Sequence, residues 1–219
     1  MGWATYAPLL SQEIGASCPA DSPGFAARYA RWQAAHELPA DGVFKAVEFD
    51  RLRDALALRR PFVQQTAKGL CPEAPEPATL ATARAEEGYG GKRVQLQPAA
   101  LTAYRAMVAA ARRDGVGTRP PALFLVSGYR GPAEEAARCG DGGCDKLTRA
   151  RCSAHRTGMA IDLYIPPAPG QPPISTADAN RRHMAGTVEY RWLVANARRF
   201  GFLPYAYEPW HWEWAGAAP

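Results

Sequence analysis

The strongest constraint on the fold comes from a short segment near the C-terminus in which aromatic and polar residues alternate. Trp210, Trp212 and Trp214 occupy every second position, and His211 and Glu213 lie between them. A period of two residues is typical of a β-strand, whose successive side chains point to opposite faces. We therefore expect a strand that directs three tryptophans to one face and His211 to the other.

A second alternating segment predicts a neighbouring strand. Aliphatic residues occupy every second position of residues 159–165, and Asp162 lies between two of them. His155 precedes Asp162 by seven residues, which would suit one face of a helix, but Gly158 and the alternation argue against a helix here. Two strands side by side would bring Asp162 and His211 together.

The side chains predicted to meet are suited to a zinc ion (Zn2+). Catalytic zinc sites commonly use three protein ligands and leave one position for water. His155, Asp162 and His211 supply such a set, and Glu208 is a carboxylate left over to accept a proton. Glu213 is the competing base, and we rank it second, as a partner that orients a histidine ligand.

The two segments also carry a family resemblance. Residues 153–162 read Ser-x-His-x-x-Gly-x-Ala-x-Asp, and residues 208–211 read Glu-x-Trp-His. Together they resemble zinc peptidases that trim bacterial cell-wall peptides, namely D-alanyl-D-alanine carboxypeptidases and dipeptidases of the VanY and VanX type, with lysostaphin-like and hedgehog relatives. The resemblance covers about residues 85–214. It implies an α+β fold, with a small antiparallel sheet flanked by helices.

The resemblance assigns roles to further residues. Residues 127–130 read Ser-Gly-Tyr-Arg, and Arg130 would polarise the scissile carbonyl beside the base Glu208. The alternative for Arg130 is a salt bridge at a strand end. Substrate-binding residues would be Ser153, Tyr129 and Arg130, although Ser153 also suits an ordinary turn. Glu213 and Trp210 would contact the metal ligands without binding the metal themselves.

One departure from the family leaves the substrate open. Family members often carry a glutamine that touches substrate in the helix after the Ser-Gly-Tyr-Arg segment. Here residues 133–136 read Ala-Glu-Glu-Ala, with no glutamine. The terminal D-alanine of a peptidoglycan stem peptide remains the expected target, but its exact context stays undetermined.

The N-terminal part has a different pattern. Residues 20–62 resemble small helical peptidoglycan-binding modules through Trp32-Gln33, Leu38-Pro39 and Asp41-Gly42-Val43, followed by a leucine-containing helix. The alternative is a helical hairpin that packs on the main domain. We expect a small all-α domain at residues 1–70, a proline-containing linker at 71–91 and a zinc peptidase domain at 92–219.

Local patterns predict three further elements. Residues 98–114 have helical spacing, begin with a proline and are followed by a glycine. Residues 187–200 predict a second helix, with Val188, Trp192 and Ala195 on its buried face. Residues 122–126 form a continuous apolar run and predict a buried strand.

Cysteine and charge bear on location and partners. The five cysteines contain no Cys-x-x-Cys pair, which favours disulfides in an oxidising compartment over a zinc ribbon. Cys71 could tie to Cys18, and Cys139, Cys144 and Cys152 crowd one loop, so the pairing of the five cysteines stays open. We expect a periplasmic or secreted protein, although no signal peptide is present in this sequence, and no stretch is apolar enough to span a membrane.

The net charge of +5 is mild, and the arginines are scattered. A weak positive field suits anionic cell-wall polymers, and we expect a monomer with no nucleic-acid partner. No Gly-x-Ser-x-Gly, phosphate-loop or dinucleotide motif is present.

The leading hypothesis is a zinc-dependent D-alanyl-D-alanine carboxypeptidase that trims stem peptides. The alternatives are a lysin-like peptidoglycan endopeptidase and a non-catalytic wall-binding protein. As a wall-binding module the N-terminal part would bind glycan, whereas as a helical hairpin it would only shield the cleft.

Overall fold

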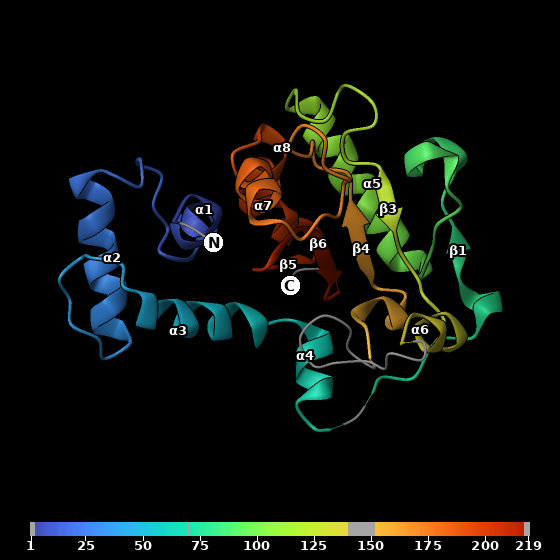
Figure 1. The fold of residues 1–219 in the computed structure, drawn as a ribbon, viewed down its shortest axis with the longest axis horizontal. Helices are drawn as coiled ribbons and strands as arrows, with labels where there is room; N and C mark the ends of the chain where they lie inside the picture. The colour runs from blue at the N-terminus through green and yellow to red at the C-terminus, as the bar shows by residue number, and fades with distance from the viewer. Residues whose placement is uncertain (1–2, 70, 140–151, 217–219) are drawn as a thin grey trace.

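The computed structural model describes residues 3–69, 71–139 and 152–216. At its centre, four antiparallel strands form a sheet in the order β3-β4-β6-β5. The strands are Leu125–Ser127 (β3), Ala160–Leu163 (β4), Phe202–Tyr205 (β5) and Glu208–Trp214 (β6). Helices surround this sheet, and a helical region precedes it (Figure 1). The predicted α+β fold class with a small antiparallel sheet is confirmed.

The two strands predicted from alternating residues lie side by side in the middle of the sheet. β4 pairs with β6 so that Asp162 is opposite His211 and Ile161 is opposite Trp212. Ile161 and Trp212 are almost completely buried, at 0% and 1% exposure. Because side chains alternate along both strands, this register directs Asp162 and His211 to the same face of the sheet.

The strand expected at residues 122–126 is shorter and begins later than predicted. Leu123 has a left-handed backbone with φ 63°, which a continuous strand does not allow, and β3 begins only at Leu125. Backbone pairing between this segment and the residue that follows β4 nevertheless continues. Leu123 donates its backbone N–H to the Tyr164 carbonyl at 2.8 Å, and Tyr164 donates to the Phe124 carbonyl at 2.7 Å.

Helices cover the sheet. The helix expected at residues 98–114 is confirmed as α5, Pro98–Arg113, with Asp114 as its C-cap. The others that flank the sheet are α6 (Pro132–Cys139), α7 (Asp178–Ala185) and α8 (Val188–Asn196). None of the helices within the described ranges is long and apolar enough to cross a membrane.

The helix expected at residues 187–200 is present, but its predicted buried face is wrong at two of three positions, because only Trp192 is buried. It consists of α8 and a 3-10 turn, η5 (Ala197–Phe200), which ends at Gly201 with a left-handed φ of 83°. Val188 is 59% exposed, and Ala195 is also exposed. Besides Trp192, the buried face carries Tyr190, Leu193, Val194 and Ala197.

The N-terminal region packs directly on the central four-stranded sheet and its helices. It comprises α1 (Trp3–Glu13), α2 (Pro23–Ala35), α3 (Ala46–Ala57) and α4 (Pro61–Thr66). Figure 1 shows α1 between α2 and the α7–α8 pair. Leu9, Leu10 and Leu56 join the same hydrophobic core as Trp212 and Phe202 of the sheet.

A buried polar network fixes the turn between α2 and α3. Gln33 is fully buried, accepts a hydrogen bond from the backbone of Gly42 at 2.8 Å and donates to Glu48 at 3.0 Å. The Tyr29 hydroxyl donates to the other oxygen of Glu48 at 2.5 Å. Gly42 has a φ of +72°, and a Cβ there would lie 2.7 Å from the Ala26 carbonyl. Gln33 and Gly42, which belong to the pattern that resembles wall-binding modules, therefore stabilise the fold of this region.

The segment predicted as a linker contains short structured elements. These are η1 (Pro77–Thr79), β1 (Ala81–Thr82), η2 (Ala85–Glu87) and η3 (Tyr89–Gly91). β1 pairs with β2 (Gln95–Leu96) in a two-stranded antiparallel sheet. Glu87 forms two hydrogen bonds of 2.8 Å with Arg105 of α5. The second half of this segment therefore packs on α5, and the predicted domain limits stay a prediction.

The disulfide expected between Cys18 and Cys71 is wrong. Cys71 is bonded to Cys152, which lies 81 positions later in the chain, and Cys18 has a free thiol. α4 carries the chain away from Cys18, in the α1–α2 connection, to the lower edge of the sheet (Figure 1). Cys144 and the side chain of Cys139 lie outside the described part of the structure.

Candidate metal centre

The three predicted metal ligands meet in one buried cluster. His155, Asp162 and His211 each offer a ligand atom, and these atoms all lie within 4.8 Å of one another. The three residues are only 4%, 4% and 5% exposed. Two imidazoles and one carboxylate at this spacing match the donor set of a catalytic zinc site.

His155 is placed by a turn immediately before β4. It lies in η4 (Ala154–Thr157), whose N-cap is Ser153 and whose C-cap is Gly158, with a left-handed φ of 69°. His155 Nδ1 lies 2.7 Å from the Gly128 carbonyl, so this nitrogen carries the proton and donates it. The other nitrogen, Nε2, lies 3.2 Å from Asp162 Oδ2 and is the one available to a metal.

Gly128 is required for this arrangement. A Cβ at Gly128 would lie 2.5 Å from Val94 Cγ1 and 2.6 Å from the Gln95 carbonyl oxygen. Both distances are shorter than real Cβ atoms show, so only glycine allows the close approach that places the carbonyl beside His155.

His211 is held in the opposite tautomeric sense. Its Nδ1 lies 2.9 Å from Asp162 Oδ1, and its Nε2 lies 3.3 Å from Glu213 Oε1. The Nε2 proton is therefore directed to Glu213, which leaves Nδ1 as the ligand atom that faces the cluster. A carboxylate that accepts the outer N–H of a histidine ligand fixes its orientation and raises its basicity.

The cluster strongly favours a positive charge at its centre. Burial alone would raise the pKa of Asp162, but the adjacent His155 and His211 lower it well below its ordinary value. Burial would lower the pKa of His211, whereas its hydrogen bonds to Asp162 and Glu213 raise it to about 9. A proton or a divalent metal ion would supply the favoured charge, so the side chains fit a bound cation.

Glu208 is the first residue of β6, three positions before His211, and it is half-buried. Its carboxylate forms no hydrogen bond or ion pair with any other residue in the described ranges. Pro209 follows it and is buried, which restricts the Glu208 backbone to extended conformations. The backbone of Glu208 is thus restricted, while its carboxylate oxygens have no hydrogen-bond partner within the described ranges.

Arg130 and Ser153 lie together beside the cluster. Arg130 Nη1 donates to Ser153 Oγ at 3.3 Å, and the Arg130 backbone N–H donates to the His155 carbonyl at 3.1 Å. The Arg130 side chain is 13% exposed, and burial lowers its pKa, although a guanidinium stays charged. Tyr129 is half-buried, and its backbone N–H donates to Gln95.

Two residues near the site were not identified from the sequence. Glu135 of α6 accepts hydrogen bonds from the Ser153 backbone and from Arg156, both at 2.9 Å, and so holds the turn that carries His155. Arg60, between α3 and α4, forms a buried ion pair with Glu213. The sequence gives no local signal for either residue. Glu135 is a buried charge on a short amphipathic helix, and Arg60 contacts a residue 153 positions away.

Trp210 is 2% exposed and belongs to the hydrophobic core. It lies next to His211 in β6, where alternation directs its side chain to the opposite face. Its predicted role as a residue that supports the metal ligands stays a prediction.

The family model for VanY, D-alanyl-D-alanine carboxypeptidase, matches residues 147–217. This range contains all three ligand candidates, Glu208 and Ser153. The expected similarity to VanY-type carboxypeptidases is confirmed over this segment. No curated protein sequence matches the chain.

Two of the solved structures that the chain matches are similar to it over part of its length. The structure "VanYB in complex with D-Alanine-D-Alanine" is 21% identical over 65% of this chain and 81% of that chain, with a TM-score of 0.39. The structure of the LdcB LD-carboxypeptidase, described as revealing the molecular basis of peptidoglycan recognition, is 24% identical over 56% of this chain, with a TM-score of 0.38. The match spans 60% of the LdcB chain, less than two thirds of its length.

Proposed function

We propose that the chain is a zinc-dependent D-alanyl-D-alanine carboxypeptidase, which removes the terminal D-alanine from peptidoglycan stem peptides. The observation that carries this proposal is the buried cluster of His155, Asp162 and His211, whose ligand atoms all lie within 4.8 Å of one another. The cluster lies inside the segment that matches the VanY family model.

Each ligand has one atom that suits the ion. His155 Nε2 and His211 Nδ1 would bind it, because the other nitrogen of each ring already faces a backbone or side-chain oxygen. Asp162 would add a carboxylate oxygen. When bound there, zinc would polarise the scissile carbonyl and lower the pKa of a water molecule in its open position.

Glu208 is the proposed general base. It would accept a proton from the attacking water and pass it to the amine of the departing D-alanine. Its position at the start of β6, beside Pro209 and without a partner in the described ranges, supports this role. Glu213 is less suited, because Arg60 and His211 already share its Oε1 oxygen.

Arg130 and Ser153 are the proposed substrate-binding pair, with Tyr129 beside them in the chain. The Arg130 guanidinium would stabilise negative charge that develops on the carbonyl oxygen. The Ser153 hydroxyl, 3.3 Å from Arg130 Nη1, would bind the carboxylate of the terminal D-alanine. Both groups come from segments next to His155, which supports their joint action on one substrate.

The test is hydrolysis of a synthetic stem peptide that ends in D-Ala-D-Ala. We expect release of one D-alanine, loss of activity with a chelator, and recovery on addition of zinc. A Glu208→Gln variant should bind zinc normally and lose activity by ~100-fold or more. Chelator-resistant activity, or no cleavage of any wall peptide by the zinc-loaded protein, would contradict the proposal.

Mass spectrometry of digested sacculi separates this proposal from the endopeptidase alternative. A carboxypeptidase shortens each stem by one alanine, whereas an endopeptidase releases cross-linked or internal fragments. If the protein only binds the cell wall, Glu208→Ala would leave wall binding and the cellular phenotype unchanged.

The disulfide between Cys71 and Cys152 supports an extracytoplasmic location, because disulfides persist in oxidising compartments. We further propose that the N-terminal region contacts wall glycan and that the protein acts as a monomer. Sedimentation of this protein with purified sacculi would test the first statement, and sedimentation velocity would test the second.

A further inference from the structure

We propose that Arg60 is a positioning residue for the metal centre, and that the N-terminal helical region thereby completes the catalytic site. Arg60 would fix Glu213, and Glu213 would fix the His211 ring that presents Nδ1 to the ion. This inference rests on the proposed zinc site and extends it to a part of the chain outside the segment that matches the VanY family model.

The ion pair between Arg60 and Glu213 is almost completely buried. Arg60 Nε donates to Glu213 Oε1 at 2.9 Å, and Arg60 Nη2 contacts the same oxygen. The two side chains are only 8% and 4% exposed. The same Oε1 lies 3.3 Å from His211 Nε2, so one oxygen joins the guanidinium to the imidazole.

A buried pair of this kind acts through geometry. Removing one partner leaves the other charge buried and unpaired, which is strongly unfavourable or forces the side chain to move. Without Arg60, Glu213 would turn toward water, and His211 would lose the acceptor that fixes its ring. The planar guanidinium, with two N–H groups on one oxygen, defines the carboxylate position better than a single ammonium would.

Arg60 is also linked to His211 through the ring of Tyr205. The Arg60 guanidinium lies over the Tyr205 ring, with Cζ 4.1 Å from the ring centroid. The Tyr205 ring is edge-on to the His211 ring, with centroids 5.9 Å apart. Arg60 therefore packs against both residues that flank His211 on this side, Glu213 and Tyr205.

The rest of the N-terminal region supports the same hairpin. Phe49 of α3 packs edge-on to Tyr207, with ring centroids 6.2 Å apart, and Arg53 donates to the Tyr207 hydroxyl at 3.4 Å. Tyr207 lies in the turn between β5 and β6, directly before Glu208. Figure 1 shows α3 running from the α2 side of the molecule to α4 at the lower edge of the sheet. The region thus contacts the hairpin that carries both Glu208 and His211.

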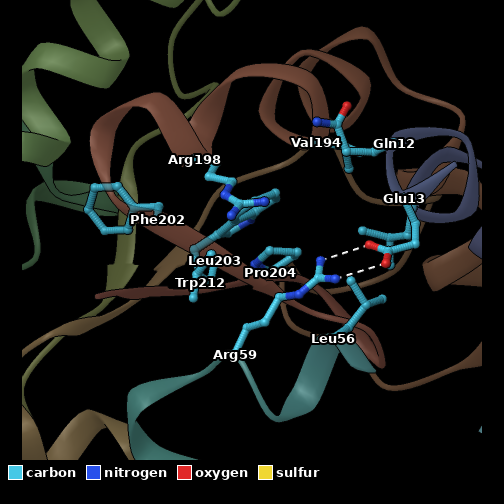
Figure 2. A pocket seen from close by; sticks show the side chains of 11 residues that line it. Gln12, Glu13, Leu56, Arg59, Val194, Arg198, Phe202, Leu203, Pro204 and Trp212 are labelled. Atoms are coloured by element: carbon cyan, nitrogen blue, oxygen red, sulfur yellow. Dashed lines mark hydrogen bonds and ion pairs between the residues drawn. The ribbon is translucent and has the colours of Figure 1, made fainter. Parts of the chain in front are cut away.

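Arg59 provides a matched control. It is the neighbouring arginine in the same connection, but it forms two hydrogen bonds with Glu13 of α1, at 2.7 and 2.8 Å. Figure 2 shows this pair at the edge of a cavity of about 190 Å³ between the N-terminal region and β5–β6. Arg59 is 40% exposed and has no contact with Glu213 among the described residues. Its removal would disturb the same interface without disturbing His211.

The test measures zinc affinity by competition with a chromogenic chelator, with thermal unfolding as a check on folding. Arg60→Gln should weaken zinc binding by ~10- to 100-fold, and Arg60→Lys should weaken it less. Arg59→Gln should stay within about twofold of the unchanged protein. In Co2+-loaded protein, Arg60→Gln should also shift the visible absorption bands, which report ligand geometry, whereas Arg59→Gln should not.

A double-mutant cycle separates positioning from general damage. If Arg60 acts through Glu213, adding Arg60→Gln to Glu213→Gln should weaken zinc binding by no more than about twofold further. Additive losses, equal losses in the Arg59 variant, or wild-type zinc affinity in a folded Arg60→Gln protein would each overturn the inference while leaving the proposed function intact. If the unchanged protein binds no zinc, the proposed function and this inference fail together.

Discussion

The bond between Cys71 and Cys152 provides a quantitative test of how the N-terminal region is attached. The bond closes a loop with a sequence separation of 81. In the chain-entropy model, a loop of this length stabilises the folded state by about 4.5 kcal/mol, and measured values commonly lie at 2–4 kcal/mol. The Cys71→Ser/Cys152→Ser protein should therefore lose roughly 2–4 kcal/mol of unfolding free energy.

Urea unfolding, followed by tryptophan fluorescence, measures this loss. Reduction of the unchanged protein should produce a similar decrease. The matched control is Cys18→Ser, which removes the free thiol and should change stability by less than about 0.5 kcal/mol. A loss below about 1 kcal/mol in the double variant, or an equal loss in Cys18→Ser, would refute the reasoning.

Three further predictions concern packing, pH and catalysis. Gly128→Ala should cost ~1–3 kcal/mol of unfolding free energy and weaken zinc binding, because its Cβ would lie 2.6 Å from a backbone oxygen of β2 and displace the carbonyl that holds His155. Calorimetry measures both the stability and the zinc affinity, and unchanged values would contradict the prediction. The hydrogen bonds from Arg105 lower the pKa of Glu87, so the stabilisation is present above the pKa of the unfolded chain and is lost as pH falls through the lower folded value. Glu87→Gln should therefore cost about 0.5 kcal/mol at pH 7 and nothing near pH 2 in urea titrations, and a cost that grows toward low pH would refute this. Glu208→Gln should reduce kcat without changing zinc affinity, and a parallel loss of zinc would instead make Glu208 a structural residue.

Two of the three ligands were predictable because the residues of β4 and β6 alternate in polarity. Alternation places Asp162 and His211 on the face opposite the apolar side chains of their strands, and the antiparallel pairing of β4 with β6 then places them opposite each other. His155 depends on more than its own strand. Its turn is held by Gly128 and Glu135, which come from elements earlier in the chain.

The features that were wrong or missed depend on distant packing. In α8, Val188 and Tyr190 both begin plausible apolar stripes, and only the neighbouring sheet decides that Tyr190 is buried. Cys71 has a nearer candidate partner in sequence, yet the path of α4 takes it to Cys152. Arg60 reaches Glu213 across 153 positions, and no local periodicity reports such a contact.

The most direct test of the account is anomalous diffraction at the zinc edge from crystals of the zinc-loaded protein. The account predicts one strong peak within ~2.0–2.2 Å of His155 Nε2, an Asp162 oxygen and His211 Nδ1. A peak that lies elsewhere, or no peak at a saturating zinc concentration, would contradict it.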